Sequence, residues 1–248
     1  YDPYRASKGC SELVFSAYLK SFFSQKNSAH PEPVEGQNSV LCPQISQISA
    51  SAPRFGPRLG AASARAGNVI GGGDWGKDRL VPDCIRALSS GQTIGIRSPR
   101  AVRPWQHVLE PLSGYLHLGA ALYQNPRTYS GTWNFGPDDS SHLTVAAMTD
   151  RLIKYWGSGA WDDLSDPNAL HEANLLKLNC DKVHAELNWH SALTIDECLQ
   201  MTAGWYRIFY ATPPRDSMYE ICTQQIAEYV ERAKSRNLIW TENIGMQP

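Results

Sequence analysis

Apolar residues recur every three or four positions in several stretches of the chain, the spacing of one face of an α-helix. The first stretch follows Pro3, and its apolar members run from Leu13 to Phe23. Because proline fits the first turn of a helix, we expect a helix that begins near Pro3. The same spacing predicts helices over 82–90, 109–123, 143–156, 181–187, 194–209 and 218–234. Gly91 ends the helix over 82–90, and Thr194 caps the helix over 194–209.

Short runs suited to β-strands lie between these helices. They span 61–70, 93–97, 131–136 and 175–178. The small residues of 61–70 indicate a buried parallel strand that helices pack against closely. Strands that alternate with helices predict an α/β fold.

One segment, from Ser24 to Leu59, breaks the pattern. Prolines and polar residues dominate it, and no period persists. Such a long irregular run is uncommon inside a compact domain, so we interpret 25–60 as a mobile surface insertion. A lid or a partner-binding loop is the second interpretation.

Composition narrows the class of protein. The chain has 248 residues and a formal net charge of -1, so nothing indicates a broad nucleic-acid surface. No apolar run approaches the roughly 20 residues that a membrane span needs. The cysteines are scattered without a Cys-x-x-Cys pair, which is typical of reduced thiols in a cytosolic protein rather than of a disulfide framework or a zinc site. Since the chain opens on Tyr1 and not on Met, we expect it to be a piece of a longer protein.

Tyr4 and Lys8 form the first candidate for chemistry. Four residues apart on one helix, they share a face. A cation beside a phenol lowers the pKa of the phenol, which makes Tyr4 a candidate proton donor and acceptor near neutral pH. On the spacing alone, an ordinary pair of surface side chains is the simpler interpretation.

A glycine run and a basic stretch are the other candidates. Gly71, Gly72 and Gly73 follow an expected strand, and they permit a close backbone approach or a positive φ. We interpret them as a turn that packs closely or as a flexible turn. We do not interpret them as a dinucleotide fingerprint, because we expect the Gly-x-Gly-x-x-Gly spacing to be absent. Arginines then gather beside Trp105 and His107, at positions 97, 100 and 103. Guanidinium groups bind phosphate oxygens and indoles stack on planar groups, so this stretch favours an anionic, partly planar ligand over an exposed basic loop.

These motifs together resemble a known family. The chain is similar to the extended short-chain dehydrogenases/reductases, and within them to the CDP-glucose 4,6-dehydratases, which are NAD-dependent nucleotide-sugar dehydratases. The similarity covers about residues 1–24 and 61–230. Its motifs are Tyr4-x-x-x-Lys8 and the stretches 63–75, 79–83, 103–108, 177–182, 187–190 and 205–206.

The resemblance implies a fold and a division into domains. The fold would be an incomplete Rossmann-type parallel sheet with a smaller α/β substrate-binding domain. Residues 1–70 and 103–136 would be the remnant of the dinucleotide-binding domain, and residues 71–102 and 137–248 the nucleotide-sugar-binding domain. The full-length protein would be a cytoplasmic homo-oligomer that serves deoxysugar biosynthesis, including that of lipopolysaccharide O-antigen.

Roles for individual residues also follow from the resemblance. Tyr4 would assist hydride transfer at sugar C4, and Lys8 would hold the ribose of the cofactor NAD and keep Tyr4 acidic. The substrate-binding residues would be Asn68 and Arg103 at the diphosphate, Leu80 and Val81 on the nucleotide side, Arg97 at the nucleotide, and His107.

The implied reaction is the dehydration of CDP-glucose to a 4-keto-6-deoxy sugar nucleotide, with hydride removed at C4 and returned at C6. In the family, the phosphate-binding turn and the acid and base that remove water precede the tyrosine. A non-catalytic nucleotide-sugar-binding fragment is therefore the alternative of a different class. A dTDP-glucose dehydratase and a nucleotide-sugar epimerase are related alternatives.

Overall fold

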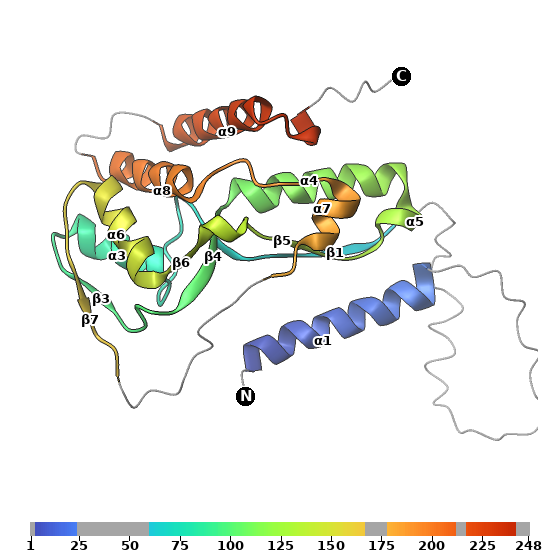
Figure 1. The fold of residues 1–248 in the computed structure, drawn as a ribbon, viewed down its shortest axis with the longest axis horizontal. Helices are drawn as coiled ribbons and strands as arrows, with labels where there is room; N and C mark the ends of the chain where they lie inside the picture. The colour runs from blue at the N-terminus through green and yellow to red at the C-terminus, as the bar shows by residue number, and fades with distance from the viewer. Residues whose placement is uncertain (1–2, 24–59, 167–177, 212–216, 242–248) are drawn as a thin grey trace, which may run out of the picture. The chain divides into compact units, whose positions relative to one another are not determined.

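The computed structural model describes residues 3–23, 60–166, 178–211 and 217–241 (Figure 1). Its internal contacts divide the chain into two compact units. Unit 1 comprises Tyr1–Ser63 and Ala120–Thr132, and unit 2 comprises Ala64–Gly119 and Trp133–Pro248. Each is described by itself. The expected insertion at 25–60 lies almost wholly outside the described residues, and the domain boundaries given above stay predictions.

Unit 1 contains the expected first helix, α1, which spans Pro3–Tyr18 and continues as a π-helical turn over Leu19–Phe23. The hydroxyl of Ser63 lies 3.4 and 3.5 Å from the carboxylate oxygens of Glu12, which ties α1 to the first strand of the same unit. Asn125 caps the short helix α5 (Pro126–Tyr129) by accepting the N–H of Thr128 at 3.3 Å.

The strands form three small sheets. β1 (Ala62–Ala66) pairs with β5 (Gly131–Phe135). β4 (Val102–His107) lies between β2 (Asn68–Ile70), to which it is parallel, and β6 (His142–Thr144), to which it is antiparallel. β3 (Ile94–Ile96) runs parallel to β7 (Trp161–Asp163). Parallel pairs joined through helices confirm the α/β prediction.

The expected strand over 61–70 is two strands. It breaks at Gly67, whose N–H donates to the Phe135 carbonyl oxygen at 3.2 Å. Most residues on both sides of the break are half-buried or exposed, so the prediction of a buried strand is wrong there. The strand predicted at 175–178 falls almost entirely outside the described residues.

The helices of unit 2 confirm the periodicity of the sequence. They are α3 (Leu80–Ser89), α4 (Leu109–Gln124, whose last turns belong to unit 1), α6 (Val145–Trp156), α7 (Asp181–Leu187), α8 (Ile195–Phe209) and α9 (Met218–Ser235). Short 3-10 turns lie at Asp139–Ser141 and Ile239–Thr241. Within the described ranges, no helix combines the length and the apolar character needed to cross a membrane.

Strand β4 was not expected from the sequence, and it corrects one interpretation. Trp105 is only 5 % exposed and belongs to the main apolar cluster. Its indole N–H donates to the Leu143 carbonyl oxygen at 3.4 Å. Trp105 therefore packs inside unit 2, and the idea that it offers a face to a ligand is wrong.

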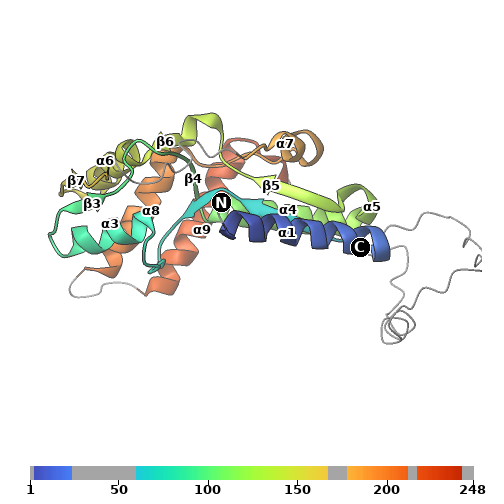
Figure 2. The ribbon, with the colours of Figure 1, turned by 90° about the horizontal axis from the view of Figure 1, so that it is seen from below.

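The core of unit 2 lies among α3, α6 and α8, which gather beside the β3–β7 pair in both views (Figures 1 and 2). The members that are less than 1 % exposed are Cys84, Ile85, Met148, Leu152, Leu199, Ala203 and Tyr206. Burying a side chain of this size stabilises the fold by about 1.5–3 kcal/mol. The same helices fix the loop that connects β2 to α3.

That loop packs on α8 at a distance that only glycine allows. A Cβ atom built on Gly72 would lie 2.1 Å from the indole of Trp205, and Gly73 has φ +79°. Both reasons for glycine that the sequence indicated are therefore present. Trp75 closes the contact, with its ring 6.4 Å from Trp205 and 4.9 Å from Phe209 between centroids.

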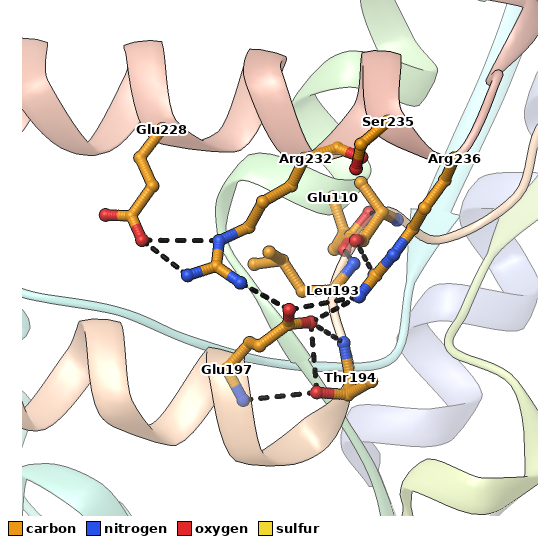
Figure 3. Close-up of polar contacts among 9 residues, drawn as sticks. Glu110, Leu193, Thr194, Glu197, Glu228, Arg232, Ser235 and Arg236 are labelled. Carbon is orange, nitrogen blue, oxygen red and sulfur yellow. Dashed lines mark hydrogen bonds and ion pairs between the residues drawn. The ribbon is translucent and has the colours of Figure 1, made fainter.

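A buried carboxylate joins three other parts of unit 2. Glu110, 1 % exposed in the first turn of α4, accepts the N–H group of Leu193 at 2.7 Å (Figure 3). It also accepts the N–H group of Ala192 at 3.0 Å and the hydroxyl of Tyr229 at 2.9 Å. Burial raises the pKa of Glu110 to about 7, although these donors and Arg236 oppose the shift. The interaction ties α4 to α9 and to the segment that leads into α8.

A second carboxylate fixes the start of α8 against the end of α9. Thr194 and Glu197 form a capping box, in which each side chain accepts the backbone N–H of the other. Glu197 also binds the guanidinium groups of Arg232 and Arg236 (Figure 3). Partial burial opposes ionisation, yet the Thr194 N–H and Arg236 lower the pKa of Glu197 to about 2.

The pKa of Glu110 predicts a specific pH dependence of stability. Because the folded pKa of about 7 lies above the ordinary glutamate value of 4.5, the contribution of Glu110 to stability is full below pH 4.5 and is lost as the pH rises through 7. We expect the stability difference between wild type and Glu110→Gln to decrease by about 2–3 kcal/mol between pH 5 and pH 8, at 1.36 kcal/mol per pKa unit. Urea unfolding across this range measures it.

The control for this experiment is Glu231→Gln, because Glu231 is exposed on α9, where it pairs with Lys234 at 2.7 Å. Its stability difference from wild type should stay level with pH. If the stability difference between wild type and Glu110→Gln also stayed constant with pH, the raised pKa of Glu110 would be contradicted.

The Gly72 contact predicts opposite effects for two alanine substitutions. Gly72→Ala should destabilise unit 2 by about 1–3 kcal/mol, because the added methyl group overlaps the Trp205 indole. Gly204→Ala is the matched control. It lies on α8 next to Trp205, and a Cβ atom there would meet nothing within 4 Å. It should stabilise by about 0.5–1 kcal/mol, since alanine favours a helix interior. Chemical unfolding in which both variants shift the same way would contradict the packing.

Candidate functional site

The loop between β2 and α3 is held in place by hydrogen bonds as well as by packing. The Tyr206 hydroxyl donates to the Asp74 carbonyl oxygen at 2.7 Å and lies 3.0 Å from the Asp74 N–H. The Asp74 carboxylate accepts the N–H of Gly76 at 2.9 Å and pairs with Arg79 at 3.0 Å. Partial burial works against ionisation, but Gly76 and Arg79 hold the pKa of Asp74 below its usual value. The loop thus delivers the chain to α3 in a defined conformation.

The glycines of this loop have the spacing Gly-x-Gly-x-x-Gly, counted from Gly71 to Gly73 to Gly76. In a dinucleotide fingerprint, the helix opens directly at these glycines and its first turn receives the pyrophosphate. Here α3 begins only at Leu80, and Gly72 faces Trp205. The geometry favours a packing turn, as the sequence analysis had it.

The N-terminus of α3 offers unused backbone donors. Its cap residue, Arg79, makes no side-chain capping bond. No acceptor for the N–H groups of Leu80 and Val81 lies in the described part of the chain, whereas the Asp83 N–H donates to the Arg79 carbonyl oxygen at 3.0 Å. Free N–H groups and the positive end of the helix dipole attract anions. Val81 as a whole residue is 3 % exposed, and it belongs to the main apolar cluster.

Arg97 lies close to this helix end. It follows β3, and its guanidinium group is 3.1 Å from the carboxylate of Asp78, two residues before α3. The two side chains are 74 % and 81 % exposed. An ion pair this exposed is weak, so an incoming anion can replace Asp78 as the partner of Arg97.

Asn68 and Arg103 lie on neighbouring strands, β2 and β4, of the three-stranded sheet. Asn68 of β2 is opposite Trp105 of β4, and Arg103 precedes Trp105 by two residues. Because side chains alternate along a strand, these three positions share one face of the sheet. Arg103 donates one bond to the Val102 carbonyl oxygen at 2.9 Å. The sheet therefore brings an amide and a guanidinium group to the same face.

His107 ends β4 and is 2 % exposed. Its Nδ1 accepts the N–H of Leu109 at 3.3 Å, and burial lowers its pKa to about 4. Its Nε2 has no partner within the described residues. A neutral, enclosed imidazole at the end of β4 fits a role in supporting the strand end better than direct contact with an anion.

Tyr4 and Lys8 lie on α1, in unit 1, and the helix expected for them is confirmed. Their positions one turn apart place them on one face. Their side chains lie outside the described part of the structure. The residues discussed above all belong to unit 2, so the two groups are treated separately.

Sequence reasoning missed the polar residues that hold the α3 loop. They are Asp74 and Arg79, which pair with each other, and Asp78, which pairs with Arg97. One local signal was present, since Asp-x-Gly at 74–76 is typical of a turn in which the aspartate accepts a backbone N–H two residues on. The pairing of Asp78 with Arg97 across 19 residues has no such signal.

No protein-family model matches the chain. A curated protein from Salmonella typhimurium, named CDP-glucose 4,6-dehydratase, is 40 % identical over 231 residues, which are 93 % of this chain and 56 % of that protein. The chain therefore spans about half the length of the curated relative that it matches.

Solved structures share the fold at low identity. A dTDP-glucose 4,6-dehydratase from Bacillus anthracis, in complex with NAD, superimposes with a TM-score of 0.56 at 17 % identity, over 84 % of this chain and 52 % of that one. A dTDP-glucose 4,6-dehydratase from Streptomyces venezuelae, also with NAD bound, gives 0.57 at 19 % identity, over 86 % and 54 %. The chain thus has the Rossmann-like α/β fold of these structures, and the 40 % identity confirms its resemblance to the CDP-glucose 4,6-dehydratases.

Proposed function

We propose that the chain forms the nucleotide-sugar-binding part of an NAD-dependent CDP-glucose 4,6-dehydratase, which converts CDP-D-glucose to CDP-4-dehydro-6-deoxy-D-glucose. The observation that carries this proposal is the 40 % identity to a CDP-glucose 4,6-dehydratase along 93 % of the chain. The geometry of unit 2 supports it, since donors for an anionic ligand meet at one helix end.

The start of α3 is the proposed diphosphate and nucleotide site. The N–H groups of Leu80 and Val81 would bind phosphate oxygens, and Arg97 would add a charge-assisted bond when it leaves Asp78. Because Trp205 and Tyr206 hold the preceding loop, the helix end needs little reorganisation on binding.

The sheet of β2, β4 and β6 would supply further contacts to the substrate. Asn68 and Arg103 would contact the diphosphate from the face that they share. His107 would support the site without touching the substrate, since it is enclosed at the end of β4. It lies beside the glycine loop, because a Cβ atom on Gly71 would be 3.9 Å from its Nε2.

Tyr4 and Lys8 are the proposed catalytic and cofactor-binding residues. They fit this role because α1 places them one turn apart on one face. NAD, when bound, would accept a hydride from sugar C4 and return it at C6. Tyr4 would remove the proton of the C4 hydroxyl, and Lys8 would hold the nicotinamide ribose and keep the phenol acidic.

The remaining parts of the proposal follow from the resemblance. They are a cytoplasmic homo-oligomer and a role in making deoxysugars, including those of lipopolysaccharide O-antigen. A dTDP-glucose dehydratase activity and a non-catalytic nucleotide-sugar-binding role are the competing functions. The two experiments below separate them.

Substitutions of arginine test the binding site. Arg97→Ala and Arg103→Ala should each weaken CDP-glucose binding by about 1.5–3 kcal/mol, because each removes a charge-assisted bond. Arg100→Ala is the matched control, an exposed arginine between them that lies outside the family motifs. Calorimetric titration of the chain with CDP-glucose and with dTDP-glucose measures the effects. Equal losses for all three arginines would contradict the site, and tighter binding of dTDP-glucose would favour the competing dehydratase.

Tyr4→Phe tests the catalytic proposal in a protein that joins this chain to the dinucleotide-binding segment of its Salmonella relative. The substitution removes only a hydroxyl group, so the fold should persist, but kcat should fall about 10²–10⁴-fold because the positioned acid/base group is gone. Tyr18→Phe is the control, since Tyr18 is 59 % exposed on the same helix. A near-normal kcat in Tyr4→Phe, or no turnover by the unsubstituted protein, would leave binding without catalysis as the function.

A further inference from the structure

Three side chains that can ligate a metal meet near α7, two of them close together in the sequence and one more than forty residues earlier. They are Asp138, in the loop after β5, His184 on α7, and His190, in the loop after α7. One ligand atom from each lies within 4.8 Å of the others. Asp138 is exposed, and both histidines are half-buried. All three belong to unit 2.

The backbone beneath each of these residues is fixed by fully buried neighbours. Val183 and Trp189, both less than 1 % exposed, precede the two histidines directly. Trp189 donates its indole N–H to Ser113 at 3.1 Å, and its ring lies 5.2 Å from that of Phe135, the last residue of β5. Asn134 of β5 donates to the Asn179 carbonyl oxygen at 2.9 Å, just before α7. These contacts hold the loop after β5 beside α7.

The imidazoles of His184 and His190 lie face to face. Their rings stack with centroids 4.6 Å apart and planes inclined by 14°. Nε2 of His184 is buried and has no partner within the described residues.

We propose that Asp138, His184 and His190 form a binding site for a divalent transition-metal ion, of which Zn²⁺ is the expected occupant. Two imidazoles and one carboxylate suit an ion of intermediate softness, whereas Mg²⁺ and Ca²⁺ prefer oxygen ligands throughout. Three protein ligands leave a fourth tetrahedral position for water.

Binding requires a modest local adjustment. Zn²⁺ held at about 2.1 Å from each ligand sets the ligand atoms about 3.4 Å apart in tetrahedral geometry. One imidazole must turn about its Cβ–Cγ bond so that the two in-plane lone pairs converge, and this torsion is soft. The exposed Asp138 side chain supplies the remaining movement. The bound ion would tie the loop after β5 to α7.

The test is titration of the tag-free, chelator-treated chain with Zn²⁺, with thermal unfolding as a second readout. Wild type should take up one more equivalent than His184→Ala or His190→Ala, or bind it roughly tenfold more tightly or better. Zn²⁺ at 100 times the wild-type Kd should raise the wild-type Tm by about 5 °C, and it should raise the Tm of both variants by no more than about half as much.

The matched control is His117→Ala, because His117 is also half-buried with one ring nitrogen that has no partner in the described part of the chain. It should retain the wild-type stoichiometry. Unchanged Zn²⁺ uptake in both His184→Ala and His190→Ala, or no saturable uptake by wild type, would overturn the proposal.

A measurement on wild type alone covers the case in which the variants fail to fold. Pulsed electron paramagnetic resonance of the chain loaded with one equivalent of Cu²⁺ should show modulation from the remote nitrogens of two equivalent imidazoles. One imidazole, or none, would overturn the site. Circular dichroism of each variant without metal shows which case applies.

Discussion

The close approach of Gly72 to the Trp205 indole is the contact on which the candidate site depends. It seats the loop after β2 on α8, where the Tyr206 hydroxyl binds both backbone polar groups of Asp74. The loop then has one path to α3. Any side chain at residue 72 would push this path outward, and the free N–H groups at Leu80 and Val81 would move with it. A packing constraint in the core thus sets the position of the polar donors.

Periodicity predicted the helices well because each one buries a single apolar face. For α8, the capping box at Thr194 and Glu197 agrees with the apolar pattern that follows, so the start of the helix is specified twice. For α3, Gly91 marks the end, as its φ of +65° requires. Where local chemistry and long-range packing favour the same element, the sequence alone sufficed.

The strand and the polar contacts that the sequence did not predict have a common physical cause, which is pairing between distant segments. β4 contains Pro104, and proline argues against an inner strand because it cannot donate to the ladder. The strand exists because β2 and β6 pair with it on both sides, with Pro104 opposite His142. The Arg97–Asp78 pair and the Asp138–His184–His190 cluster likewise join residues that no local pattern connects. Of the candidate site, the helix end and the glycine turn were therefore predictable, but their polar partners were not.

The charged groups of unit 2 divide by how firmly they are held. Glu110 and Glu197 each bind several donors and join α4, α8 and α9, so removing either leaves partners unpaired. Arg97, by contrast, is paired once and is largely exposed. A ligand that recruits Arg97 gives up little, since the lost ion pair is screened by water. Firm pairing therefore maintains the scaffold, and weak pairing leaves the arginine at the start of α3 free to exchange Asp78 for a phosphate.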